Sequence, residues 1–177
     1  MSQPIEIAPA RLPDDLPAVA ALFREYAGGL DVDLCFQDFD AELASLPGAY
    51  APPEGRLLLV RRGDEPVGCG ALRPLGDGRC EMKRVFLRPS VRGAGLGERL
   101  VRRLCDEARA AGYRELRLDT LPSMTAAIAL YERLGFVPIE PYVHNPVPGA
   151  RFLSLDLRAL SPPARTPAAD ARPDRSP

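Results

Sequence analysis

The chain has 177 residues, a length that suits one domain and leaves little room for a second. Hydrophobic residues make up 46% and charged residues 27%, so the chain is able to bury a sizeable core, and this composition excludes a wholly disordered protein. The 23 basic residues are balanced by 24 acidic ones, and the net charge of −1 argues against a dedicated nucleic-acid-binding protein.

The first half of the chain alternates apolar runs with turn residues. In chain order it predicts a strand at 5–8, helices at 13–26 and 39–46, and strands at 57–60, 67–72 and 80–87. Pro13 suits an early position in the first helix, and Gly28-Gly29 ends that helix. The segment RRGDEP at 61–66 has the composition of a hairpin turn between two strands.

The second half contains the clearest helix. Leu96, Leu100, Leu104 and Ala108 recur every four residues until Gly112, which is the spacing of an amphipathic helix. The remaining elements are a strand at 116–119, a helix at 124–134 and strands at 136–137 and 152–157. About seven strands and four helices in this order predict a single-domain α/β (α+β) fold with an antiparallel N-terminal part.

The C-terminal segment looks separable from this domain, which we place at 1–160. Residues 161–177 contain five prolines and no aliphatic residue larger than alanine. Such a segment cannot build a core or hold a helix, so we predict a disordered tail.

The residues present also bear on metal binding and location. The four cysteines form no C-x-x-C pair and the chain has one histidine, too few for the usual zinc sites, so we expect no metal. Apolar stretches stay far short of the roughly 18 residues of a membrane span. The N-terminus lacks the basic start and apolar run of a secretory signal. We therefore expect a cytoplasmic protein with reduced, mostly buried thiols.

A glycine-rich turn joins the strand at 80–87 to the helix that begins near Leu96. Its sequence is Arg92-Gly93-Ala94-Gly95-Leu96-Gly97. Glycines allow positive φ angles and a close approach of the backbone to a ligand. The first amides of the following helix lack partners within it and the helix dipole adds positive charge, so the turn predicts an anion site of the kind that holds pyrophosphates. Arg92 adds a cation beside it.

The spacing of the glycines excludes two common nucleotide-binding motifs. Five residues after Gly93, where a P-loop has its second glycine, the chain has Glu98. The dinucleotide fingerprint has its third glycine at that same place. For an isolated trio of glycines, a connection that binds no ligand stays the alternative.

Two motifs together resemble the GCN5-related N-acetyltransferase (GNAT) superfamily. The Q/R-x-x-G-x-G/A signature of that family appears as Arg92, Gly95 and Gly97. Its later A-x-x-x-Y-x-x-x-G-F element appears as Ala127, Tyr131, Gly135 and Phe136. The likeness extends in element order from residue 5 to 157 and is sharpest from 81 to 137. The likeness indicates the superfamily and does not identify the substrate.

The resemblance implies a GNAT-like fold, with a mixed central sheet whose parallel strands at 80–87 and 116–119 splay apart to bind acetyl-coenzyme A (acetyl-CoA). The backbone of Val85, Phe86 and Leu87 is then expected to pair with the pantetheine arm. The pyrophosphate is expected on the amides of Arg92, Gly93, Ala94, Gly95, Leu96, Gly97 and Glu98. Ala127 and Tyr131 are expected to complete the coenzyme site.

Acetyl transfer to an amine needs an acceptor for the ammonium proton and benefits from a proton donor for the departing thiolate. Glu81 lies in an otherwise apolar strand, where burial makes a carboxylate a stronger base, and many members of the superfamily have a catalytic glutamate there. The alternative is a carboxylate paired with Arg84 or another arginine. Tyr131 resembles the general acid of the family, and the alternative is a core tyrosine with a satisfied hydroxyl.

One residue departs from the family pattern. Met124 stands seven residues before Tyr131, where the family often has asparagine. Methionine cannot make the polar contacts of an amide, so that coenzyme contact is lost or is supplied by Ser123 or Thr125.

The acceptor site is the least determined part of the sequence. Its candidate residues are Asp33, Phe36, Arg84, Asp119, Thr120, Tyr142 and His144. The first two lie between the first two helices, a region that shapes the acceptor pocket in this superfamily. Arg84, together with Arg73, is a candidate to bind a substrate carboxylate. For the loop residues, simple exposure to solvent is the alternative.

We therefore predict an acetyl-CoA-dependent N-acetyltransferase that acts by direct attack of a small-molecule or peptide amine. We expect no covalent enzyme intermediate, nucleic-acid partner or membrane partner, and we leave a homodimer open. A non-catalytic acyl-CoA-binding module on the same fold is the alternative, and the presence of both Glu81 and Tyr131 favours the enzyme. A nucleotide-binding protein is the weaker rival.

Overall fold

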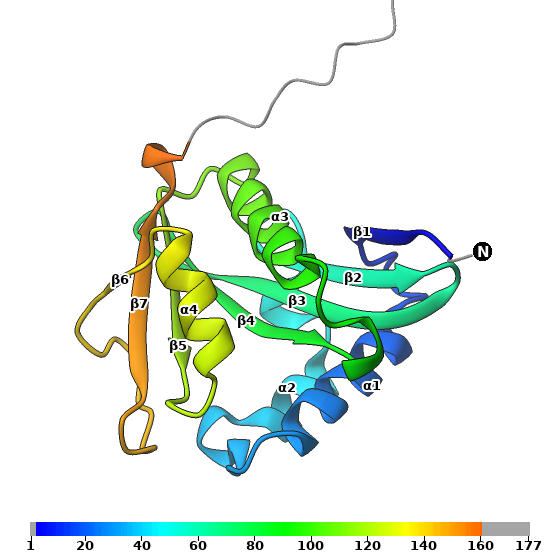
Figure 1. Ribbon diagram of the computed structural model, residues 1–177, viewed down its shortest axis with the longest axis horizontal. Helices are drawn as coiled ribbons and strands as arrows, with labels where there is room; N and C mark the ends of the chain where they lie inside the picture. Colours follow the sequence, from blue (N-terminus) through cyan, green and yellow to red (C-terminus); the bar gives the residue numbers. More distant parts are fainter. Residues whose placement is uncertain (1–2, 161–177) are drawn as a thin grey trace, which may run out of the picture.

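The computed structural model describes residues 3–160, in which seven strands form one open sheet with helices on both faces (Figure 1). The strands are β1 (Ile5–Pro9), β2 (Arg56–Arg62), β3 (Glu65–Gly76), β4 (Arg79–Leu87), β5 (Glu115–Thr120), β6 (Val137–Pro138) and β7 (Arg151–Asp156). The helices are α1 (Leu16–Gly28), α2 (Phe39–Ser45), α3 (Leu96–Ala110) and α4 (Thr125–Arg133). The tail predicted at 161–177 lies outside the described residues, so the boundary at 160 stays a prediction.

The order of the sheet is β1-β2-β3-β4-β5-β7-β6. β1 to β4 pair antiparallel with their neighbours, and β7 pairs antiparallel with both β5 and β6. β4 and β5 are parallel, and α3 forms the crossover between them. A mixed sheet with an antiparallel N-terminal part and four helices confirms the fold class predicted above.

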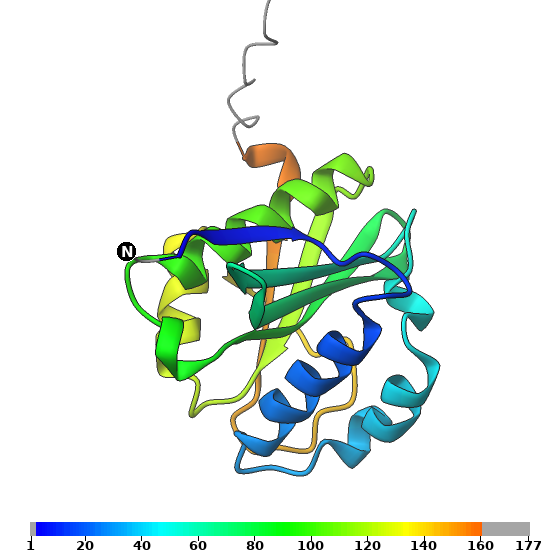
Figure 2. The ribbon, with the colours of Figure 1, turned by 90° about the vertical axis from the view of Figure 1, so that its right-hand side faces the viewer.

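Each face of the sheet has its own apolar core, because successive strand side chains point to opposite faces. On one face, Leu72 and Met82 belong to a cluster that includes Leu104 of α3. On the other face, Ala71 of β3 packs with Phe23 of α1. Figure 2 shows α1 and α2 on the opposite side of the sheet from α3. Within residues 3–160, each helix is too short or too polar to span a lipid bilayer.

The two parallel strands separate soon after they meet. β4 and β5 pair at three positions, the last of which joins Glu81 to Arg117. Beyond this point β4 bulges away, since Arg84 has a φ of 58° and the register with β3 shifts between Cys69 and Ala71. The carboxyl ends of the two strands therefore form a fork, the place where α/β sheets bind ligands.

Some element boundaries differ from the predicted ones. α1 begins at Leu16 rather than at Pro13, because residues 12–15 form turns and Pro17 is the proline of its first turn. β3 extends well beyond the predicted 67–72, because Arg73 and the residues after it also pair with β4. α4 begins one residue later than predicted, since Met124 is its N-terminal cap residue.

A buried ion pair fixes α2 against the bulge of β4. The Arg84 side chain is 1% exposed, and its Nε and Nη2 atoms donate to the two carboxylate oxygens of Glu42 at 2.8 and 3.3 Å. The Tyr50 hydroxyl donates to the same carboxylate at 2.6 Å. The guanidinium also lies over the ring of Phe39. These contacts hold the α2 segment over the face of the sheet that carries the fork.

We predict that Glu42→Ala lowers the free energy of unfolding by about 3–5 kcal/mol, because it leaves a buried guanidinium without its counter-charge. The matched control is Glu65→Ala, whose 49% exposed carboxylate pairs with Arg62 and Arg88 and should contribute about 1 kcal/mol or less. Urea unfolding of both variants measures the two values. Equal losses in the two variants would contradict the structural role of the buried pair.

Candidate active site

A glycine-rich turn with free backbone amides lies between β4 and α3. Gly93, Ala94 and Gly95 have consecutive positive φ angles of 97°, 48° and 73°, conformations that glycine adopts without strain. Among residues 3–160, five amides of this turn donate no hydrogen bond: those of Gly93, Ala94, Gly95, Gly97 and Glu98. The dipole of α3, which has 15 residues, adds positive charge at the same place. The loop therefore has the donors that a diphosphate requires.

An open groove of about 510 Å³ extends from this loop past β4 and α4. Eight residues that the sequence assigns to the coenzyme line it: Val85, Phe86, Leu87, Arg92, Gly93, Gly97, Ala127 and Tyr131. Arg92 lies against the strand end, where its Nε donates to the Leu87 carbonyl oxygen at 2.9 Å. Beyond Glu81, β4 has no strand partner on the β5 side, so its backbone edge is open to a ligand.

The other residues assigned to the coenzyme do not line the groove. Ala94 and Gly95 form the exposed turn itself, and Leu96 is buried in the core beneath α3. The Glu98 side chain pairs with Arg102 at 2.8 Å. At Ala94, Gly95 and Glu98 the backbone amide is still free to contact an anion, whereas the amide of Leu96 donates to the Gly93 carbonyl oxygen at 3.1 Å.

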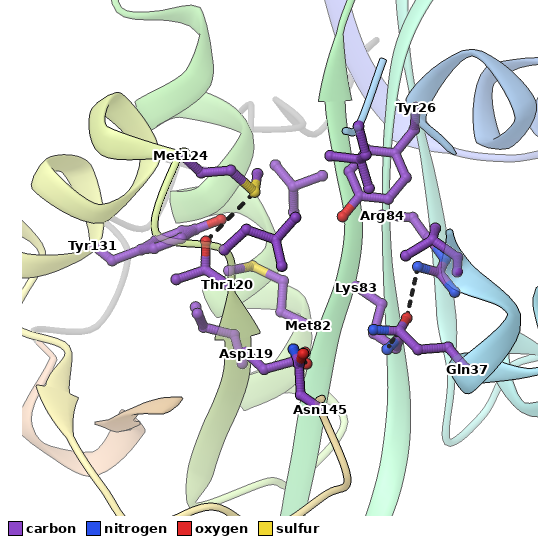
Figure 3. A pocket seen from close by; sticks show the side chains of 15 residues that line it. Tyr26, Gln37, Met82, Lys83, Arg84, Asp119, Thr120, Met124, Tyr131 and Asn145 are labelled. Atoms are coloured by element: carbon purple, nitrogen blue, oxygen red, sulfur yellow. Dashed lines mark hydrogen bonds between the residues drawn. The ribbon is translucent and has the colours of Figure 1, made fainter. Parts of the chain in front are cut away.

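A second cavity, of about 40 Å³, lies in the fork between β4 and β5 (Figure 3). Five residues line both this fork cavity and the groove: Tyr26, Leu30, Val85, Met124 and Tyr131. The two spaces therefore adjoin.

Tyr131 stands where the two spaces meet. Its side chain is buried, and its ring centroid lies 5.4 Å from that of Phe136. Among residues 3–160, its hydroxyl makes no hydrogen bond, and every fully buried side-chain oxygen or nitrogen there has a partner, so the hydroxyl oxygen is accessible from the spaces that Tyr131 lines. Burial raises the pKa of this hydroxyl, so it keeps its proton at neutral pH. The arrangement suits a group that gives a proton to a ligand.

The methionine that departs from the family pattern lines both the groove and the fork cavity. The Thr120 hydroxyl donates to the Met124 sulfur at 3.5 Å, which places Thr120 in the wall of the fork cavity. Ser123 and Thr125 line the groove beside it. A ligand in the groove could therefore form a hydrogen bond with the hydroxyl of Ser123 or of Thr125.

Glu81 is completely buried and does not line either space. Its Oε2 accepts from Arg73 Nε at 2.6 Å, and its Oε1 accepts from the Tyr142 hydroxyl at 3.0 Å. The Lys83 ammonium lies 4.0 Å from Oε1. The arginine paired with Glu81 is thus Arg73 and not Arg84, and this carboxylate is separated from the fork by other side chains.

A third cavity, of about 240 Å³, opens on the α1–α2 face of the fork. It shares Gln37, Lys83 and Asp119 with the fork cavity, so the two spaces adjoin at these residues. The Asp119 Oδ2 accepts from the Asn145 side-chain amide at 2.9 Å. His144 lines the outer part of this cavity. We refer to this space as the acceptor cavity.

The remaining residues assigned to an acceptor occupy different places. The Asp33 carboxylate is exposed and accepts from the Cys35 amide at 2.9 Å, a local bond that caps the short 3₁₀ helix Leu34–Gln37 containing Phe36. Arg84 lines the fork cavity, but Glu42 and Gln37 accept from its guanidinium. The Tyr142 ring packs against Phe152 and under the Arg117 guanidinium.

Several residues that line these spaces are not predicted by the sequence analysis, among them Tyr26 and Lys83. The sequence places Tyr26 at the end of a helix and Lys83 in a strand. A signal was present for Lys83, because it is the single lysine of the chain and it stands in a strand predicted to be central to the sheet. For Tyr26 the sequence carried no signal, since its place depends on how α1 packs on the sheet.

A family model described as the acetyltransferase (GNAT) family matches residues 16–136 of the chain. The chain belongs to this family. An N-acetyltransferase of Schizosaccharomyces pombe is 40% identical to it over 157 residues, which cover 86% of this chain and 95% of the relative. The Escherichia coli N-acetyltransferase YjgM is 33% identical over 131 residues, 71% of this chain and 78% of the relative.

Solved structures of GNAT proteins show the same fold. A Klebsiella pneumoniae protein described as an acyl-CoA N-acyltransferase is 30% identical to this chain, with a TM-score of 0.62. The match covers 86% of this chain and 97% of the Klebsiella chain. A Salmonella typhimurium acetyltransferase solved with its cofactor acetyl-CoA has a TM-score of 0.66 at 22% identity, over 95% and 99% of the two chains. This GNAT protein is an acetyl-CoA-dependent acetyltransferase, and acetyl-CoA is its cosubstrate. The open groove and the unpaired amides of its glycine turn fit that cosubstrate.

Proposed function

We propose that this GNAT enzyme acetylates the primary amine of a small molecule or peptide, with Tyr131 as general acid and Glu81 as general base. The observation that carries the proposal is the Tyr131 hydroxyl. It belongs to the wall of the groove and of the fork cavity, and makes no hydrogen bond within residues 3–160. A group in that position can contact both the end of a ligand in the groove and an amine that enters the fork.

Acetyl-CoA supplies an acetyl thioester, whose transfer releases a thiolate. The chain holds its diphosphate through the amides between Gly93 and Glu98, with Arg92 beside them. The free backbone edge of β4 from Val85 to Leu87 supplies donors and acceptors for its amide-bearing arm. Tyr131 keeps a proton at its Oη and gives it up where the thiolate leaves.

The general-base role of Glu81 requires a relay, because its carboxylate is completely buried. Two routes are consistent with its contacts. A bridging water can carry the proton past Lys83, or the Tyr142 hydroxyl, which already donates to Glu81 Oε1, can pass its proton on and accept another. Either route leaves the amine uncharged for attack and the proton on Glu81.

We predict that Glu81→Gln lowers kcat by about 10²-fold and that kcat/KM of the variant rises with pH until the amine is free base in solution. The matched control is Glu115→Gln, which removes a carboxylate that pairs with Arg117 at 2.7 Å outside the fork and should leave kcat unchanged. The melting temperatures show whether both variants fold. A folded Glu81→Gln variant with wild-type kcat and pH profile would exclude the general-base role.

A thiol-release assay with acetyl-CoA tests the function as a whole. Amino acids, polyamines, aminoglycosides and peptides serve as acceptors, and mass spectrometry identifies the product as an amide. Turnover of no amine in this panel, by a protein that binds acetyl-CoA, would contradict the proposal.

We also propose a cytoplasmic enzyme, since all four cysteines are free thiols and three of them are buried. The homodimer stays a prediction, which light scattering of the purified protein tests directly.

A further inference from the structure

One wall of the acceptor cavity carries two cations that share one carboxylate. Three cationic side chains approach the fork on its α1–α2 side: Arg84 pairs with Glu42, and Arg73 pairs with Glu81 at 2.6 Å. Lys83 is 8% exposed, and its ammonium lies 4.0 Å from Oε1 of the same Glu81, farther than a hydrogen bond reaches. Asp38, which is exposed, also lines this cavity.

The Lys83 ammonium uses few of its donors. It has three N–H groups, and within the described chain it makes one hydrogen bond, to the Gln37 Oε1 at 3.0 Å. Burial, together with the nearby Arg84 and Arg73, lowers the pKa of Lys83. Arg73 likewise donates only through Nε in this part of the chain, so its two terminal amino groups are available. Both residues line the acceptor cavity, and an anion there would balance a buried charge.

The β5 wall of the same cavity carries the opposite charge. The Asp119 carboxylate accepts from Asn145 through Oδ2, and its Oδ1 makes no hydrogen bond within residues 3–160. Asp119 lines both the acceptor cavity and the fork cavity, as Lys83 does (Figure 3). Because β4 and β5 separate after Glu81, a ligand in the fork has a cation on one side and a carboxylate on the other.

We propose that the acceptor is a free amino acid, whose carboxylate binds Lys83 and Arg73 and whose ammonium binds Asp119. This inference rests on the proposed function and names its substrate class. The side chain of the amino acid would occupy the part of the acceptor cavity beside Val143 and His144; the whole cavity has a volume of about 240 Å³. The amine would then point into the fork cavity, toward Tyr131.

The same charges disfavour the other acceptor classes. A polyamine would place its second ammonium near Lys83 and Arg73, where like charges repel. The terminal amine of a peptide lacks the adjacent carboxylate, so Lys83 and Arg73 would still share the single carboxylate of Glu81. A free amino acid carries an ammonium and a carboxylate on the same carbon atom, so one small molecule can contact both walls of the cavity.

The test is a thiol-release assay with matched acceptor pairs on the unmodified enzyme. Each amino acid is compared with its decarboxylated amine and with its carboxamide. We expect kcat/KM to be at least about 30-fold higher for the amino acid, the size of a lost charge-assisted hydrogen bond to a buried cation. Equal or better turnover of the amines and amides would overturn the inference and leave the proposed function intact. Turnover of no amine would instead contradict the proposed function.

A variant locates the preference in the cavity. Lys83→Met keeps an unbranched apolar stem and removes the ammonium group. The ratio of kcat/KM between amino acid and amine should therefore fall toward one while the affinity for acetyl-CoA persists. Arg24→Met removes an exposed charge of α1 that lines none of the three spaces, and should keep the full ratio. An unchanged ratio in folded Lys83→Met would overturn the assignment. If that variant does not fold, the unmodified enzyme is tested with N-acetyl amino acids and their carboxamides as inhibitors. Inhibition by the acids alone would support recognition of the carboxylate, and equal inhibition by both would overturn the inference.

Discussion

Tyr131→Phe is expected to lower kcat by about 10²–10³-fold and to leave the affinity for acetyl-CoA almost unchanged. The variant removes one oxygen atom and keeps the ring that packs 5.4 Å from the Phe136 ring. Because this hydroxyl makes no hydrogen bond within residues 3–160, its loss breaks no contact there. The fold should therefore be as stable as before, and the effect should fall on the proton given to the departing thiolate.

Steady-state kinetics and calorimetric titration with coenzyme A separate these two effects. The matched control is Tyr113→Phe, which removes a hydroxyl that donates to the Glu54 carbonyl at 2.8 Å, away from the groove and the fork. It should keep the wild-type kcat. If Tyr131→Phe had the kcat of the control, Tyr131 would be a residue of the core and not the general acid.

The glycine turn shows which part of such a site is readable from sequence. Its glycines at 93 and 95 adopt positive φ, and the helix that follows begins at Leu96 as its four-residue spacing predicts. Both features are local, because they depend on neighbouring residues and on backbone sterics alone. The turn and the start of α3 could therefore be predicted without knowledge of the rest of the fold.

The acceptor side depends on contacts that the sequence does not encode locally. Lys83 and Gln37 are 46 positions apart and meet because α2 is fixed over the sheet. The bulge that opens the fork occurs at Arg84, a residue type that seldom adopts a φ of 58° and so gives no signal. The partner of Glu81 was likewise undetermined, since several arginines precede and follow it, and the pairing with Arg73 follows from the β3–β4 register.

The glycine turn also carries the second large prediction. Gly95→Asp is expected to reduce the affinity for acetyl-CoA by about 10²-fold or more, because two like charges about 4 Å apart repel by about 4 kcal/mol at an effective dielectric constant of 20. A Cβ atom at this position meets no atom of the described residues within 4 Å, so the new side chain starts in open space. Its carboxylate would instead compete with the diphosphate for the same amides.

Gly95→Asn separates charge from backbone strain. Gly95 has a φ of 73°, and asparagine and aspartate both tolerate this region better than other residues with side chains, so the two variants should have similar melting temperatures. Calorimetric titration with coenzyme A should then show much weaker binding for aspartate than for asparagine, and added salt should narrow the difference because it screens exposed charges. Equal affinities in the two variants would mean that no anion binds at this turn. The coenzyme would then have to be held by the groove alone, and the five unpaired amides at the start of α3 would have no role in binding it.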